Sequence, residues 1–125
     1  MIAIGVGCRK NCTGAEIAAL VSQALQNIDI KGQSYLFTVI DKQNESGLHE
    51  AARMLNLSLT FLPREALAAR MDQVQTKSLK AERLYGLASI SEAAALAGAG
   101  NCAKLILPRI VSAGATCAIA VSENP

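Results

Sequence analysis

Apolar residues follow two different spacings along this chain, and these spacings predict which segments are strands and which are helices. Short, nearly uninterrupted apolar runs predict strands at residues 2–5, 34–40, 57–62, 104–107 and 116–121. Apolar positions three and four apart predict helices at residues 13–27, after the polar turn 41–46 to about 55, from 63 to about 71, and at 93–97. Residues 72–85 are polar without a clear period, and we expect a loop there.

Helical segments separate the first four predicted strands, whereas only a short loop at residues 108–115 joins the last two. Strand–helix–strand connections are right-handed and place their strands parallel, and a short loop favours an antiparallel hairpin. The predicted fold class is therefore α/β. We expect a three-layer, sandwich-like single domain over residues 1–125, with a mainly parallel, mixed sheet of about five strands.

The segment after the first predicted strand combines the features of an anion-binding loop. Gly5 and Gly7 allow a tight turn with uncovered backbone N–H groups, and Arg9 and Lys10 add two positive charges. Residues 13–16 fit the S/T-x-x-E capping box, which sets the start of the next helix. Because free N–H groups and a helix dipole both favour negative charge, the segment predicts a site for an anionic group. The alternative is a solvated turn.

Further charged residues are expected at the same edge of the sheet. The carboxyl ends of parallel strands meet at one edge, where open α/β sheets bind ligands. That edge would gather Arg9, Lys10, Lys42, Arg109, Glu45 and Glu92. This set predicts a ligand with several acidic groups. Two alternatives stay open: Glu45, His49 and Arg53 form a surface ion-pair ladder, and Glu92 serves only as the capping partner of Ser89.

Composition narrows the class of protein. The 125 residues are 51% hydrophobic, which argues against a disordered chain. The net charge of +2 is too small to indicate a nucleic-acid or membrane-surface partner. Apolar runs stay well short of the roughly 18 residues that span a bilayer. Since the first residues show no signal-peptide pattern, we expect a cytoplasmic protein.

The four cysteines do not follow a metal-site pattern. Cys8 and Cys12 have no further Cys or His at zinc-site spacing, so we expect reduced thiols, no metal site and no cofactor. For Cys8, the neighbouring Arg9 and a helix N-terminus would lower the pKa of the thiol and favour chemistry there. The glycine segment lacks the third glycine of a dinucleotide fingerprint, and a single histidine gives no support for a Ser-His-Asp triad.

Five segments of the chain together resemble a known family. They are Gly5-x-Gly7-Cys8-Arg9-Lys10, then Glu16-Ile17, then Thr38-x-x-x-Lys42-x-x-Glu45 with Leu48 and Ala51, then Gly86 to Leu96 with Ser89-Ile90-Ser91-Glu92, and finally Thr116-x-Ala118-Ile-Ala120. In this order they resemble the CobE family, which is also found as the C-terminal domain of CbiG. Asn11 stands where the family usually has glycine, and residues 72–85 match no family segment.

The resemblance implies a role in cobalamin (vitamin B12) biosynthesis, with a precorrin-type tetrapyrrole as partner. It also implies contacts with other cobalamin-biosynthesis enzymes, whereas it is the composition that argues against nucleic acid or membrane as a partner. The expected ligand-binding residues are Gly5, Gly7, Cys8, Arg9, Lys10, Lys42, Ser89, Arg109 and Thr116.

Three functions stay open at this point. The first is binding a tetrapyrrole and handing it on or assisting one step. The second follows from CbiG proteins, which open the ring-A lactone of a cobalt-precorrin with release of acetaldehyde. In that case Glu45 or Glu92 would be the catalytic base. CbiG proteins carry an additional N-terminal region, so we expect this domain alone to hold an incomplete hydrolase site. The third is a structural partner of a larger corrin enzyme.

Overall fold

The structure, a computed structural model, describes residues 1–76 and 89–122. Its main elements are, in order, β1 (Ile2–Cys8), α1 (Gly14–Gln26), β2 (Ser34–Val39), α2 (Ser46–Leu55), β3 (Leu59–Leu62), α3 (Arg64–Ala68), α5 (Ile90–Ala99), β4 (Ala103–Val111) and β5 (Ala115–Ser122). Short 3₁₀ helices, Ile40–Lys42 and Met71–Gln73, follow β2 and α3. Of the predicted loop 72–85, residues 77–85 lie outside the described part of the chain.

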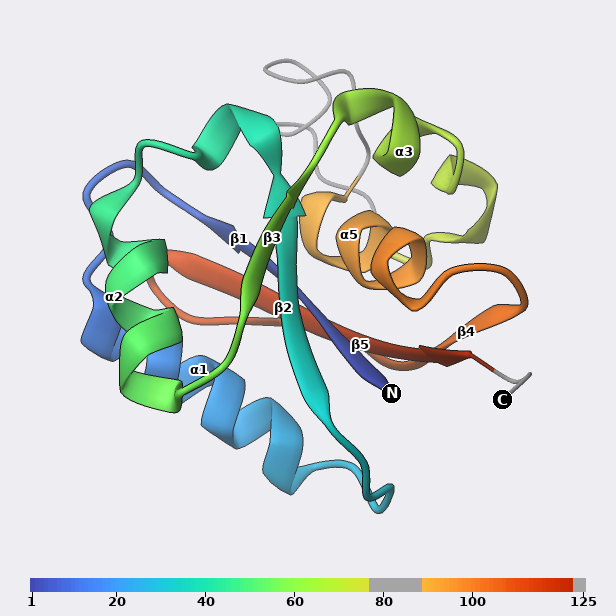
Figure 1. The fold of residues 1–125 in the computed structure, drawn as a ribbon, viewed down its shortest axis with the longest axis horizontal. Coiled ribbons are helices and arrows are strands. Elements are labelled where there is room, and N and C mark those ends of the chain that lie inside the picture. Colours follow the sequence, from blue (N-terminus) through green and yellow to red (C-terminus); the bar gives the residue numbers. More distant parts are fainter. Residues whose placement is uncertain (77–88, 123–125) are drawn as a thin grey trace.

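The strands form one sheet in the order β3-β2-β1-β5-β4 (Figure 1). β1 pairs with β2, and β2 with β3, in parallel, whereas β5 pairs antiparallel with both β1 and β4. β4 therefore runs in the same direction as β1. The ends of β1, β2, β3 and β4 meet at one edge, called the carboxyl edge below. The predicted mixed sheet and C-terminal hairpin are confirmed.

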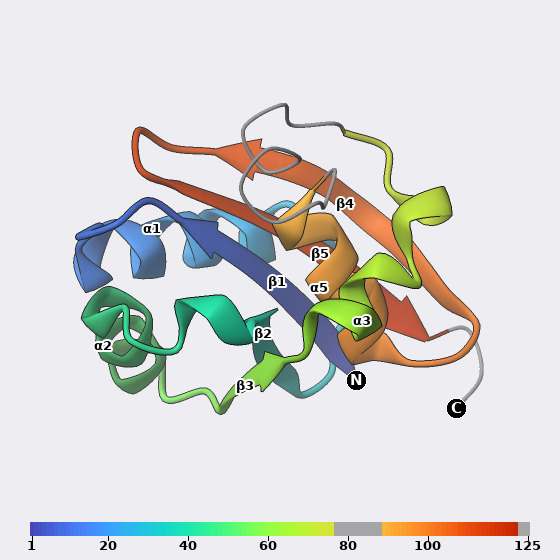
Figure 2. The same cartoon turned by 90° about the horizontal axis from the view of Figure 1, so that it is seen from above.

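Helices cover both faces of the sheet, which gives the fold three layers. Figure 2 shows α1 and α2 on one side of β1, and α3 and α5 on the other. Ile4 and Val6 of β1 belong to the core beneath α1 and α2, whereas Ala3 belongs to the core beneath α5. Side chains of a strand alternate between the two faces, so a strand with both faces buried is apolar throughout. The predicted α/β class is confirmed.

Small side chains allow α5 to lie close to the central strands. The α5 side of the core is rich in alanine, including Ala93, Ala94 and Ala95 of the helix. A Cβ atom on Gly5 would collide with the carbonyl oxygen of Ser91. The helix predicted at residues 93–97 spans Ile90–Ala99, and Gly98 lies inside it, where a Cβ would collide with the ring of Phe37. The helix ends two residues after Gly98, at its C-cap Gly100, which has a φ of 90°.

Both β1 and β4 are longer than the sequence predicts. β1 continues to Cys8 because its pairing with β5 continues to that residue. β4 continues past Pro108 to Val111, with register shifts on the way. Proline lacks an N–H group and is tolerated here because β4 is an edge strand of the sheet. The predicted loop 108–115 therefore shrinks to the turn at residues 112–114.

The third predicted helix and third predicted strand are shorter than expected. The helix ends at Ala68 instead of 71, and the strand begins at Leu59 instead of 57. Asn56, at the end of α2, has a left-handed φ of 55° and redirects the chain before β3 can begin. Across residues 1–76 and 89–122, no helix is both long and apolar enough to cross a membrane.

Candidate functional site

Gly5 and Gly7 lie inside β1, ahead of the β1–α1 loop (residues 9–13), and their small size serves packing. Beneath α5, the backbone of Ser91 leaves no room for a side chain on Gly5. A Cβ on Gly7 would lie 2.7 Å from Oγ1 of Thr116, its pairing partner in β5. The predicted glycine turn was therefore wrong, because glycine within a strand here marks a close approach of neighbouring atoms.

Three backbone N–H groups of the β1–α1 loop already have partners within the protein. The N–H of Arg9 donates to a carbonyl oxygen in the β4–β5 turn at 2.7 Å, and that of Asn11 donates to Glu45 Oε1 at 3.0 Å. The N–H of Cys12 closes a turn within the loop at 3.2 Å. The predicted row of uncovered N–H groups is wrong for these residues. The loop presents the exposed side chains of Arg9 and Lys10 instead.

Two residues between β2 and α2 hold the β1–α1 loop from its other side. Lys42 Nζ donates to the carbonyl oxygen of Cys8 at 2.9 Å, and Glu45 accepts the N–H of Asn11. α2 lies so close to this loop that a Cβ on Gly47 would collide with a loop carbonyl oxygen. The structure thus brings Lys42 and Glu45 to the loop, as the sequence predicted from the meeting of strand ends.

Glu16 connects the start of α1 to the β4–β5 turn. Its N–H donates to Thr13 Oγ1 at 3.2 Å, which confirms the predicted N-cap. Its carboxylate accepts the hydroxyl of Ser112 at 2.5 Å and the N–H of Gly114 at 2.6 Å. These two donors, the hydroxyl first, lower the pKa of Glu16. Sequence reasoning missed Ser112 and Gly114, which carry no local signal.

Glu92 is fully buried at the start of α5, and its carboxylate accepts three backbone N–H groups. The N–H of Arg109 donates to Oε2 at 2.8 Å, and those of Gln75 and Thr76 donate to Oε1 at 2.7 and 2.8 Å. Burial by itself raises the pKa of Glu92, but the donors outweigh it and the pKa is lowered. The carboxylate joins α5, β4 and the segment that follows Met71–Gln73.

This environment bears on two predicted site residues. A buried carboxylate with a lowered pKa and three donors is a poor proton acceptor near neutral pH, because protonation would sacrifice its hydrogen bonds. Ser89 is also buried, and its Oγ accepts the N–H of Glu92 at 3.4 Å as an N-cap. The Glu92 carboxylate does not complete the capping box, since the bonds it makes go to other segments.

The carboxyl edge also carries a cation that the sequence reasoning missed. Arg64, at the start of α3, donates from Nε to both carboxylate oxygens of Asp41 at 3.0 Å. Its guanidinium, through this hydrogen bond, lowers the pKa of Asp41. Arg109 is half-buried near the end of β4, with its N–H on Glu92. The most exposed positive charge of the predicted set therefore lies on Arg9 and Lys10.

The thiols of the site are not activated. Burial raises the pKa of Cys8 to about 11, and the nearby Lys42 offsets this only in part. Burial and the neighbouring Glu16 raise the pKa of Cys12 as well. The predicted lowering for Cys8 was wrong, because desolvation of the thiolate dominates. Across the described part of the chain, no three His, Cys, Asp or Glu side chains are arranged to hold a metal ion.

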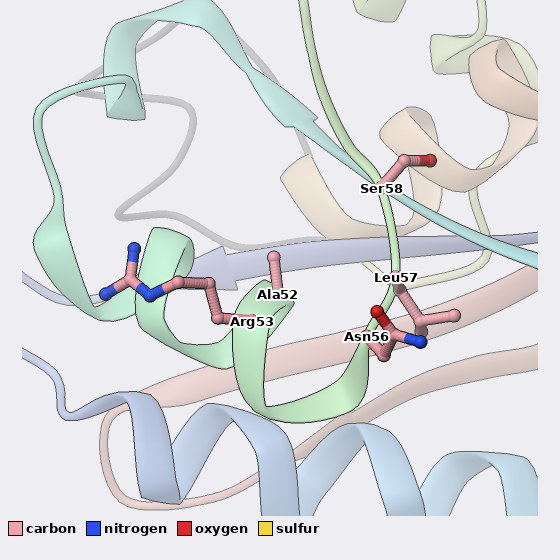
Figure 3. Close-up of a pocket in the computed structure, with 5 residues that line it drawn as sticks. All are labelled: Ala52, Arg53, Asn56, Leu57 and Ser58. Carbon is pink, nitrogen blue, oxygen red and sulfur yellow. The ribbon is translucent and has the colours of Figure 1, made fainter.

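A surface pocket of about 330 Å³ lies away from this edge, where α2 turns into β3. Figure 3 shows the residues that line it, which are Ala52, Arg53, Asn56, Leu57 and Ser58. Since β3 starts at Leu59, the pocket lies at the opposite end of that strand from the carboxyl edge. It includes none of the predicted site residues.

Comparison with known proteins defines the class of the chain. The family model described as "Cobalamin synthesis G C-terminus" matches residues 2–120, and the chain belongs to this family. A Sinorhizobium protein named CobE is 31% identical over 121 residues, which cover 95% of this chain and 79% of that protein. The chain is therefore a cobalamin-biosynthesis protein of the CobE/CbiG type, and the predicted resemblance is confirmed.

Two solved structures share the fold. The crystal structure of CobE, a protein from the cobalamin (vitamin B12) biosynthetic pathway, has a TM-score of 0.85 at 29% identity, over 96% of this chain and 89% of that one. The crystal structure of cobalamin biosynthesis protein chiG from Agrobacterium tumefaciens str. C58 has a TM-score of 0.78 at 37% identity. That comparison covers 99% of this chain and 100% of the other.

Proposed function

We propose that this protein binds a precorrin-type tetrapyrrole at the carboxyl edge of its sheet and hands it on or assists one step of cobalamin biosynthesis. The observation that carries the proposal is the β1–α1 loop. Its backbone is hydrogen-bonded on two sides, yet its adjacent cations, Arg9 and Lys10, are exposed. Family membership supplies the pathway. We further propose that the protein works in the cytoplasm and meets other enzymes of the pathway there.

The chemistry of the ligand suits such a loop. Precorrins carry several acetate and propionate carboxylates around a large apolar ring, and two exposed cations side by side can each bind one of these carboxylates. A charge-assisted hydrogen bond contributes about 1.5–3 kcal/mol. A loop with a fixed backbone loses little conformational freedom on binding, and more of that interaction then appears as affinity.

Lactone hydrolysis by this chain alone has weaker support. Such a reaction needs a base to activate water and a donor to stabilise the oxyanion. Glu92 is buried beneath three N–H donors, and Glu45 accepts an N–H from the loop. Neither arrangement favours proton transfer from a bound water to the carboxylate. We therefore favour binding over hydrolysis as the function of this domain.

The test is a titration of purified precorrin intermediates into the protein at low ionic strength, followed by visible absorbance. Arg9→Ala/Lys10→Ala should weaken binding at least about tenfold, since two charged contacts are lost. Lys31→Ala/Arg53→Ala is a matched control, because it removes the same charge from exposed residues elsewhere. The difference in affinity between the loop variant and the unchanged protein should shrink at high salt, where charges are screened.

The outcomes separate the three functions. Binding without acetaldehyde, weakened by the loop variant alone, supports the proposal. Stoichiometric acetaldehyde from a lactone-bearing precorrin would make the protein a hydrolase. Equal affinity for the loop variant and the control would remove the loop from the site. Neither binding nor product with several intermediates would favour a structural partner of a larger corrin enzyme.

A further inference from the structure

The β1–α1 loop is fixed at both ends of its cationic pair. On one end, Lys42 Nζ donates to the carbonyl oxygen of Cys8, the last residue of β1. On the other end, Glu45 Oε1 accepts the N–H of Asn11. Arg9 and Lys10 lie between these two attachments. The direction in which both cations point therefore depends on contacts made by residues of the neighbouring β2–α2 connection.

Asn11 needs such an attachment because its backbone is left-handed, with a φ of 65°. Residues other than glycine rarely adopt this backbone conformation, and Asn is among the few that tolerate it. A hydrogen bond to its N–H favours this one conformation over the alternatives open to a free loop. The Glu45 carboxylate supplies that bond at 3.0 Å.

Glu45 is also the N-cap residue of α2, but its side chain makes no capping hydrogen bond. N-cap side chains commonly accept N–H groups of their own helix, which stabilises the helix start. Here the carboxylate reaches a different segment, 34 positions away along the chain. The Glu45 side chain therefore stabilises the loop instead of the start of α2.

We propose that Glu45 is a positioning residue for ligand binding: it holds Asn11, and through it Arg9 and Lys10, without itself contacting the ligand as a base. Lys42 does the same at Cys8. The inference rests on the proposed function, in which the two loop cations bind ligand carboxylates. It assigns Glu45 a role that depends on accepting a hydrogen bond, whereas a catalytic base must accept a proton.

Two variants of Glu45 distinguish the positioning role from the role of a catalytic base. Glu45→Gln keeps an oxygen that accepts the Asn11 N–H but removes the proton acceptor, and Glu45→Ala removes both. We expect precorrin affinity to fall about five- to tenfold in Glu45→Ala and to stay within about twofold of the unchanged protein in Glu45→Gln. Hydrogen exchange at the Asn11 N–H, followed by NMR without ligand, should accelerate only in Glu45→Ala.

Each outcome decides the proposal. Loss of affinity in Glu45→Gln equal to that in Glu45→Ala, with slow Asn11 exchange in Glu45→Gln, would overturn it, because the carboxylate would then act on the ligand directly. Unchanged affinity in Glu45→Ala would overturn it too. If the unchanged protein binds no precorrin, the proposed function fails. Asn11 exchange would then show separately whether Glu45 holds the loop.

Discussion

The helices α1 and α5 begin with the same pattern, yet their glutamates lie in different surroundings. In each helix the N-cap hydroxyl accepts the N–H of the glutamate three positions on. In each, the carboxylate then leaves its own helix for the β4–β5 hairpin, with Glu16 accepting the N–H of Gly114 and Glu92 that of Arg109. Because the helices cover opposite faces of the sheet, the hairpin is held from both sides.

The difference lies in access to water. Glu92 is 0% exposed and accepts the backbone N–H groups of three residues, whereas Glu16 is partly exposed. A buried carboxylate with fixed donors has no substitute when it is removed, but water can replace a partly exposed one. The α5 side is therefore expected to be rigid, and the α1 side, next to the cationic loop, more tolerant of change.

The largest expected effect tests how tightly each helix lies against its neighbour. Gly5→Ala places a methyl group against the backbone of α5, which cannot yield without displacing the helix. We expect a loss of about 4 kcal/mol or more, or no cooperative unfolding transition at all. Gly14→Ala, at the start of α1, places its methyl group 2.7 Å from Cβ and Cγ of Glu50 in α2, with no backbone atom nearer.

Because the α2 backbone fixes Glu50 Cβ, α1 and α2 must shift slightly apart, but alanine favours a helix over glycine by up to about 1 kcal/mol and offsets part of that cost. Gly14→Ala should therefore lower stability by about 1–2 kcal/mol, clearly less than Gly5→Ala. Urea unfolding of both variants measures the contrast. Similar losses of stability in the two variants would mean that α1 and α5 accept an added methyl group equally poorly.

A smaller effect is expected from the glutamates themselves. Glu92→Ala removes a fully buried carboxylate and leaves the part-buried N–H groups of Arg109, Gln75 and Thr76 without their acceptor, which costs about 3 kcal/mol. Glu16→Ala should cost clearly less, since the Glu16 carboxylate is already partly exposed and water can take its place. Urea unfolding followed by circular dichroism compares them. An equal or larger loss in Glu16→Ala would contradict the assignment of Glu92 as the more tightly held group.

Much of this architecture was predictable from the sequence. Alternating apolar runs and helical spacings gave the strands, the layers and the hairpin, and the position of strand ends brought Lys42 and Glu45 to the β1–α1 loop. These features follow from local pattern and from the few ways in which strands connect. The N-caps at Thr13 and Ser89 were also predictable, because an N-cap is a contact between near neighbours.

The partners of the glutamates were not predictable, because they are distant in sequence. Glu16 bonds to residues 96 and 98 positions away, and no local pattern encodes such a contact. The same reason applies to Gly5. Two glycines ahead of two cations favoured the interpretation as a turn, and Gly5 is identified as a packing position only once α5 is known to cross β1 at that point.

The smallest expected effect concerns pH. The folded-state pKa values of Glu92 and Glu16 both lie below the ordinary value of 4.5, so the unfolded chain binds protons more readily. Each carboxylate therefore contributes stability above that ordinary value, and the contribution is lost as the pH falls through the folded-state pKa. Replacing either glutamate with glutamine removes its titration.

Stability of the unchanged protein should therefore exceed that of Glu92→Gln near neutral pH, and the gap should narrow as the pH falls from about 7 to about 3. For Glu16→Gln the gap should narrow less, because solvent and salt screen a partly exposed carboxylate. Unfolding free energies of the three proteins across this range measure both gaps. A gap for Glu92→Gln that stays constant with pH would mean that its donors recognise the oxygen atoms and not their charge. The contrast between α1 and α5 would then be one of burial alone.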